Sequence, residues 1–172
     1  MNRAARRSLA VLTLALCAVP AARAEVYQEP GAFVAEVFGS IPAPKVLWLT
    51  REIQVRAAAI LGHPPAQLRQ RYWSRGDKSV WILEETGKEE LITAGFVVVD
   101  GRIDHVRVLV YRESRGQEVR QSSFLKQFKD AKLAQGNLLD HDIDGIVGAT
   151  LSVAAMERMA RLALYFDRLS HE

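Results

Sequence analysis

A run of small residues that ends in two hydroxyl side chains is the part of the sequence best suited to chemistry. Residues 144–152 read Asp-Gly-Ile-Val-Gly-Ala-Thr-Leu-Ser and stand directly before a predicted helix. Gly148 lets the backbone approach a ligand closely, and Ala149 keeps steric bulk away from the hydroxyl of Thr150. The amide groups of a helix N-terminus can hold a phosphate. Taken alone, the pattern favours a simpler interpretation, a loop in which Thr150 or Ser152 caps the helix.

The acidic stretch that overlaps this segment invites a test as a calcium loop. Asp140, Asp142, Asp144 and Gly145 match the first, third, fifth and sixth positions of an EF-hand. At the twelfth position, where a bidentate glutamate completes the cage, the chain has Leu151. The stretch is therefore predicted to be a solvated polar loop. The four histidines share no ligand spacing, so no metal site is predicted.

The first 24 residues have the three parts of a secretory signal. Arginines at the start are followed by the apolar run Leu9–Val19 and by small residues that suit cleavage after Ala24. The alternative, an uncleaved membrane anchor, needs a longer apolar run. We therefore expect residues 1–24 to be a cleaved signal peptide and 25–172 to be a single domain in the periplasm. Cys17 lies in the leader, so this domain has no cysteine for disulfides or metal ligation.

The charge of the chain argues against nucleic-acid binding. The formal net charge is +3, but the leader holds four of the 23 basic residues and no acid. The remaining 148 residues therefore carry a net charge of −1. Arg69, Arg71 and Arg75 surround two aromatic residues, a composition found in nucleic-acid patches. Export and the nearly neutral domain favour a solvated strand or loop edge at this place instead.

Apolar spacing predicts helices at both ends of the domain. Residues 30–39 and 49–62 have helical periodicity and end at glycine. Residues 122–129 look helical, and a polar loop follows at 137–148. The last helix is predicted over 152–167, with one broad apolar stripe and with its arginines left to solvent, namely Arg158, Arg161 and Arg168.

The middle of the chain predicts strands. Ser79–Glu84, Leu91–Val99 and Arg102–Tyr111 are rich in branched and aromatic residues, and Asp100-Gly101 is a strong hairpin signal. In the third strand, three valines at even positions (Val106, Val108, Val110) are expected to share one buried face, opposite His105, Arg107 and Leu109. The fold class is therefore predicted as α+β, with an antiparallel β-meander of three or more strands packed with flanking helices.

The segment before the last helix resembles a known attachment motif. The FMN-binding domain family, which includes flavin-carrying subunits of the sodium-translocating NADH:quinone reductase and Rnf complexes, has the pattern Asp-x-x-[Ser/Thr]-Gly-Ala-Thr. Asp144, Gly148, Ala149 and Thr150 match this pattern, whereas Val147 departs from it. The resemblance implies that a flavin transferase moves FMN from FAD onto the Thr150 hydroxyl as a phosphoester. It also implies that the transferase reads Asp144.

A second stretch is similar to a family loop that follows the last strand and lies against the flavin. Glu113-Ser114-Arg115-Gly116 resembles Glu-Thr-Pro-Gly. The resemblance implies that Glu113 and Ser114 hydrogen-bond the ring edge and that the backbone at Gly116 approaches its face. Arg115 either stabilises negative charge on the reduced ring or is an ordinary charge on an exposed loop.

These expectations combine into an electron-transfer flavoprotein of the periplasm, with FMN covalently bound to Thr150. Because no dinucleotide fingerprint follows a strand, direct hydride transfer from NADH is not expected. The expected partners are a flavin transferase and periplasmic or membrane redox proteins, and whether the chain is itself an enzyme stays open. The alternative is a flavin-free or noncovalent-FMN interaction module, accessory to a membrane redox complex. Val147 keeps that alternative open.

Overall fold

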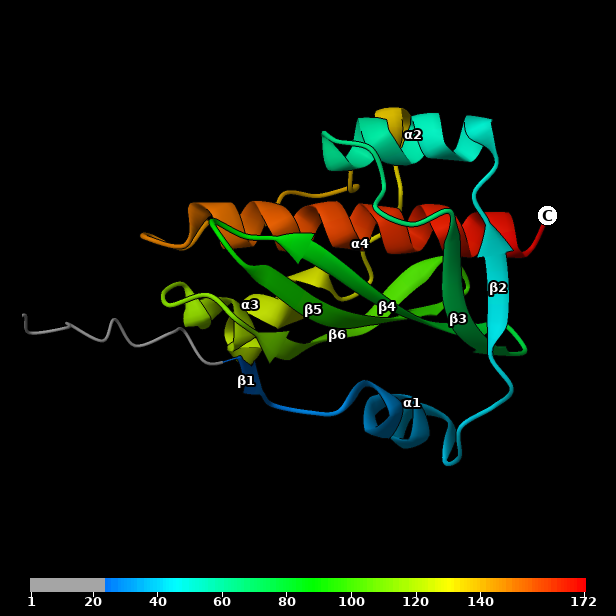
Figure 1. Cartoon of the computed structure of the whole chain (residues 1–172), viewed down its shortest axis with the longest axis horizontal. Coiled ribbons are helices and arrows are strands. Elements are labelled where there is room, and N and C mark those ends of the chain that lie inside the picture. Colours follow the sequence, from blue (N-terminus) through cyan, green and yellow to red (C-terminus); the bar gives the residue numbers. More distant parts are fainter. Residues whose placement is uncertain (1–23) are drawn as a thin grey trace, which may run out of the picture.

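A six-stranded antiparallel sheet with helices on both faces forms the protein in a computed structural model (Figure 1). The structure describes residues 24–172, so the predicted leader lies almost wholly outside the described residues. The strand order is β1-β6-β5-β4-β3-β2. The strands are β1 (Glu25–Val26), β2 (Lys45–Trp48), β3 (Arg69–Arg75), β4 (Lys78–Thr86), β5 (Leu91–Val99) and β6 (Arg102–Tyr111). The helices are α1 (Pro30–Phe38), α2 (Arg51–Leu61), α3 (Ser122–Leu125) and α4 (Thr150–Ser170), with short 3-10 turns η1 (Gln117–Arg120), η2 (Lys126–Phe128) and η3 (Gln135–Asn137). The predicted α+β class with an antiparallel meander is confirmed.

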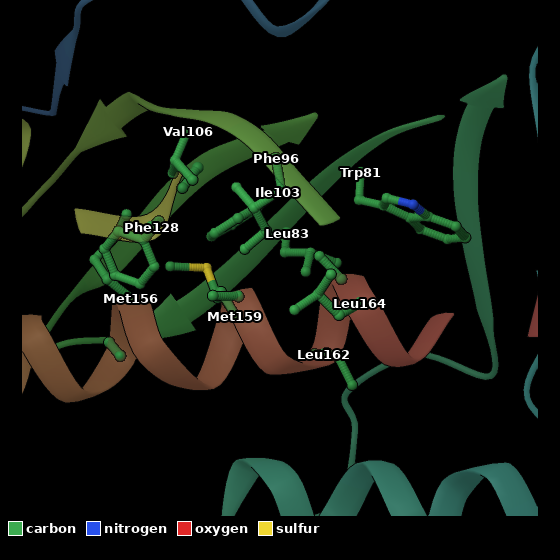
Figure 2. Packing of buried hydrophobic residues seen from close by; sticks show 14 of the residues in the cluster. Trp81, Leu83, Phe96, Ile103, Val106, Phe128, Met156, Met159, Leu162 and Leu164 are labelled. Carbon is green, nitrogen blue, oxygen red and sulfur yellow. The ribbon is translucent and has the colours of Figure 1, made fainter. Parts of the chain in front are cut away.

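The layers are stacked in the order α2, α4, sheet and α1 (Figure 1). The long helix α4 crosses one face of the sheet, and α2 covers the side of α4 that faces away from the strands. Met156 and Met159 point from α4 into the sheet, whereas Leu162 points toward α2 (Figure 2). On the opposite face, the ring of Phe33 in α1 lies over Gly95, where a Cβ atom would come within 2.3 Å of it.

The outer side of α4 is covered, which corrects the prediction for two of its arginines. Arg161 is partly buried and donates to the carbonyl of Ile60 in α2 at 3.2 Å. Arg158 is also partly buried and pairs with Glu85 of β4. Both arginines were expected in solvent from the sequence. That prediction was wrong because a stripe of apolar residues reveals one buried face of a helix, but not a second layer that covers the opposite face. Arg168 is exposed, as expected.

Two irregularities in β6 correct the predicted alternation of its side chains. The register with β5 shifts between Thr93 and Ala94, so that Leu109 has no partner, and shifts again opposite Asp104. The protein has a large hydrophobic core between the sheet and α4 and a small one between the sheet and α1. Because of the first bulge, Val110 lies with Leu109 in the small core, whereas Val106 and Val108 lie in the large core. A bulge of one residue exchanges the two faces of a strand. Tyr111 thereby points to the α4 side of the sheet.

The remaining elements agree with the sequence except at their ends. The bounds of β5 and β6 are those predicted, and residues 69–75 form an exposed strand near the sheet edge. Residues 122–129 form only a short α3 followed by η2, and α4 begins two residues earlier than expected. In the part of the chain described, no helix has the length and apolar character needed to cross a membrane.

A buried carboxylate fastens the connection between α2 and β3 to the sheet. Glu85 is 3% exposed, and its Oε1 accepts from Arg158 Nη2 at 3.0 Å and from His63 Nε2 at 3.1 Å. The other ring nitrogen of His63 lies 2.9 Å from the carbonyl oxygen of Pro64. Since both nitrogens face acceptors, the protonated imidazole is favoured. The carbonyl of Pro64 and the carboxylate of Glu85 raise the pKa of His63.

This arrangement predicts a pH-dependent stability difference between wild type and His63→Gln. A raised folded-state pKa stabilises fully below the ordinary histidine pKa of about 6.5 and less as the pH rises through the raised value. We expect the wild type to be the more stable protein at about pH 5.5, by less than about 1 kcal/mol because half of the His63 side chain is exposed. The difference should shrink toward about pH 9. Urea unfolding at both values measures it, and a pH-independent difference would contradict this role.

Candidate functional site

The two segments singled out by the sequence meet at the N-terminal end of α4. Gly116 has φ +83°, and a Cβ atom there would lie 2.8 Å from Tyr111 Oη and 2.9 Å from Ser152 Oγ. The same Cβ would lie 3.4 Å from that of Ala149. Only a residue without a side chain allows this approach. The loop after β6 is therefore in direct contact with the first turn of α4.

Tyr111 holds the two segments together. The bulge at Leu109 turns Tyr111 toward α4, where its hydroxyl donates to the carbonyl of Arg115 at 2.5 Å. The same hydroxyl lies 3.2 Å from Ser152 Oγ and shares a hydrogen bond with it. Burial raises the pKa of Tyr111, so the phenol stays protonated and remains a donor. The Tyr111 side chain is itself buried, with 2% of its surface exposed.

Glu113 faces inward and organises the turn between β4 and β5. Its Oε1 accepts hydrogen bonds from the backbone amides of Lys88, Glu89 at 2.8 Å and Glu90 at 3.0 Å. A Cβ atom on Gly87 in this turn would lie 2.7 Å from that oxygen. With three amides on one carboxylate oxygen, Glu113 is a positioning residue that brings a third segment to the site. No sequence motif indicates that this turn belongs to the site.

The first turn of α4 has no capping side chain. Ala149 is the N-cap, Thr150 is the first helical residue, and the amide of Val153 donates to the carbonyl of Ala149. The simpler interpretation, in which Thr150 or Ser152 caps the helix, is therefore wrong. The backbone amides of residues 150–152 precede the first bond of the helix and are oriented outward along its axis.

The two hydroxyls of this turn differ in access. Thr150 is exposed, whereas Ser152 is 4% exposed and lies under Gly116. Gly148 precedes them with φ +83°, and nothing lies within 4 Å of where its Cβ would be. Only the Thr150 hydroxyl can be reached by another molecule without moving the loop.

Apolar and charged side chains around Thr150 point to solvent. Val147 is fully exposed and Leu151 is 51% exposed. Ser114 and Arg115 are exposed on the adjoining loop. Large exposed apolar side chains close together are typical of a binding surface.

The polar loop that leads to Thr150 is tied to the turn η2. The exposed Asp144 donates its backbone amide to Oε1 of Gln127 at 2.7 Å. Asp140 accepts from the amide of Lys132, which lowers its pKa. Residues 24–172 contain no group of three or more His, Cys, Asp or Glu side chains placed to hold a metal ion.

A comparison with protein families identifies the family to which these segments of the chain belong. Residues 87–165 match the model of the FMN-binding domain family. This part of the chain belongs to that family. The FMN-binding domain spans the β4–β5 turn, the loop after β6 and most of α4 with its N-terminus, so all three segments of the site lie within it. The assignment gives the chain a flavin-binding role with FMN as cofactor, while no curated protein matches the chain.

The contact at Gly116 predicts a stability loss that a matched glycine does not share. Gly62 has the same φ of +83°, but nothing lies within 4 Å of its Cβ position. We expect Gly62→Ala to cost about 1–2 kcal/mol for backbone strain alone. Gly116→Ala should cost at least about 1 kcal/mol more, because the methyl group also displaces Tyr111 and Ser152. Urea unfolding compares the two, and equal losses would contradict the close approach.

Proposed function

We propose that this protein carries FMN covalently, through a phosphoester to the hydroxyl of Thr150, and relays electrons between redox proteins of the periplasm. One observation carries the proposal. In an FMN-binding domain, a Gly-Ala-Thr sequence presents an exposed hydroxyl at the uncapped N-terminus of a 21-residue helix. The buried hydroxyl of Ser152, the other candidate in this turn, has no such access.

The attachment reaction needs an accessible nucleophile and a place for the phosphate. The Thr150 oxygen attacks the FMN phosphorus of FAD, the P–O bond to the AMP phosphate breaks, and AMP leaves. The hydroxyl proton passes to a base of the transferase. The free amides of residues 150–152 and the helix dipole then face the phosphodiester anion. A tether is useful in a compartment that holds no free FMN.

The surroundings of Thr150 suit the rest of the cofactor. When bound, the isoalloxazine ring supplies the electron-transfer chemistry. Val147 and Leu151 offer exposed apolar surface on either side of Thr150 against which a flat ring can pack. Arg115 is exposed on the loop that touches Ala149, where its guanidinium favours negative charge on the reduced ring. Ser114, exposed beside it, supplies a hydroxyl for the ring edge.

One observation favours a second candidate, a flavin-free interaction module that keeps this fold. Val147 stands where the family motif has a hydroxyl. Its side chain is fully exposed, so the fold does not depend on which residue occupies the position. Any effect of Val147 is thus on recognition by the transferase or on the flavin.

Substitution of Thr150 tests the attachment site. Co-expressed with a flavin transferase and exported, the wild type and Thr150→Ser should gain the mass of one FMN less one water. Thr150→Ala should gain nothing and keep the wild-type melting temperature, because Thr150 is exposed and caps nothing. Ser152→Ala is the matched control and should still be modified. Intact mass and flavin fluorescence after denaturation report the result, and modified Thr150→Ala protein would overturn the assignment.

Substitution of Val147 separates the two candidates. We expect Val147→Thr to increase the fraction of flavinylated protein at limiting transferase, since it restores the hydroxyl of the motif. Its free energy of unfolding should change by less than about 0.5 kcal/mol, as is usual for an exposed position. Wild-type and Val147→Thr proteins that both stay unmodified would favour the flavin-free module.

A further inference from the structure

The outer edge of β6 is open along the middle of the strand. Among residues 24–172, β1 pairs only with Val110 and Tyr111. Tyr27 and Gln28 add backbone bonds to the carbonyl of Leu109, and residues 130–131 bond to Ile103 at the far end. Residues 104–108 are thus left without a strand partner on this side. In such a stretch, about half of the backbone amides and carbonyls point away from the sheet.

A groove of about 930 Å³ runs beside this open edge. Val106 and Val108 of β6 line the groove together with residues of α3 and η2, among them Leu125 and Lys126. α3 lies beside β6 at the end of the sheet where β1 and the N-terminus of α4 are found (Figure 1). The bulges at Asp104 and Leu109 bracket the open stretch, so the backbone between them is a regular strand.

Positive charge dominates the rim. Four cations and one carboxylate line the groove, and the carboxylate, Asp104, is paired with His105. Arg107 is paired with Glu36. The other three cations, Arg120, Lys126 and Lys129, have no ion-pair partner within the described part of the chain.

The cations stand on both sides of the edge. Arg107 contacts the ring of Phe33, as the neutral ring of His105 beside it does, and so lies on the α1 side of the sheet. Lys126 and Lys129 flank Phe128, which is buried in the core on the α4 side. A strand added to β6 directs alternate side chains to opposite sides. Acidic residues directed to the α4 side would therefore meet Lys126 and Lys129, whereas those directed to the α1 side would meet Arg107, which Glu36 already pairs.

From this edge, groove and charge, we propose that β6 accepts an extended, Asp- and Glu-rich segment of a partner protein as a further antiparallel or parallel strand. Backbone hydrogen bonds supply affinity in such strand addition, and the charged rim selects an acidic sequence. Lone charges on a strand edge commonly prevent pairing. Here the charges are nearly all of one sign and line a groove, which favours one class of partner.

The position of the groove suggests why a partner would bind there. This functional interpretation rests on the proposed flavin site. Arg120 ends η1, which begins directly after the loop 113–116 that touches the N-terminus of α4. A segment held along β6 thus brings its parent protein to the end of the domain where Thr150 lies (Figure 1). The inferred partner is an acidic redox protein that exchanges electrons with the flavin.

A synthetic heptapeptide, acetyl-Thr-Glu-Val-Glu-Val-Glu-Thr-amide, tests the proposal by calorimetric titration at low salt. The peptide should bind the wild type, and a version with Lys for Glu should not. Lys126→Glu combined with Lys129→Glu should weaken binding at least tenfold. The matched control, Lys45→Glu combined with Arg56→Glu, changes the net charge equally at exposed positions away from the groove and should leave affinity within twofold.

Backbone methylation separates strand addition from simple charge attraction. One peptide carries N-methyl groups on its glutamates and another on its valines, and strand addition predicts that at least one of them loses binding. Slowed amide exchange should map to residues 104–108. Binding of both methylated peptides as tightly as the parent peptide, no binding of the parent peptide, or equal losses in the two double variants would each overturn the proposal. The titrations are repeated with the Thr150→Ala protein, which carries no flavin at this position. A failure of peptide binding can then be distinguished from a failure of flavin attachment.

Discussion

The close approach of Gly116 to the first turn of α4 is the contact on which the arrangement of the candidate site depends. Tyr111 lies beneath it and bonds to the backbone of Arg115 and to Ser152 together. Without a side chain at Gly116, the loop after β6 lies against Ala149 and covers Ser152. The contact therefore decides which hydroxyl of the turn is accessible, and it leaves only Thr150 exposed.

The rest of the fold holds the two sides of that contact in place. On one side, α4 is enclosed by the sheet and by α2, so its axis and its N-terminus are fixed by packing along most of its length (Figure 2). On the other side, the bulge at Leu109 turns Tyr111 toward α4, and Glu113 binds three amides of the neighbouring turn. Bulges commonly direct a side chain next to a functional site. The proposed attachment site thus has a rigid support at the end of one helix.

Much of this architecture could be predicted from the sequence, because apolar periodicity and turn residues determine elements locally. The ranges of β5 and β6 and the helix after Pro30 follow from such patterns. The bulge at Leu109 could not be predicted, because a single unpaired residue does not interrupt the run of apolar residues that indicates a strand. The partial burial of Arg161 depends on α2, which comes from a distant part of the chain.

The candidate site likewise has parts that the sequence reveals and parts that it does not. The motif around Thr150 and the loop at Gly116 are local strings, and a resemblance was enough to single them out. Their contact, the inward carboxylate of Glu113 and the β4–β5 turn depend on tertiary packing and have no local signal. The open edge of β6 and the groove beside it could not be predicted from the sequence either, because the cations that line the groove come from two separate segments of the chain.

The most direct test of the central claim is a peptide map of the wild-type protein after export alongside a flavin transferase. The protein is denatured, digested and analysed by mass spectrometry, with flavin fluorescence to follow the modified peptide. The account predicts one FMN, joined through its phosphate, on the peptide of residues 144–152, with fragmentation placing it on Thr150 and leaving Ser152 free. FMN on Ser152, or an unmodified peptide from protein exposed to an active transferase, would contradict the account.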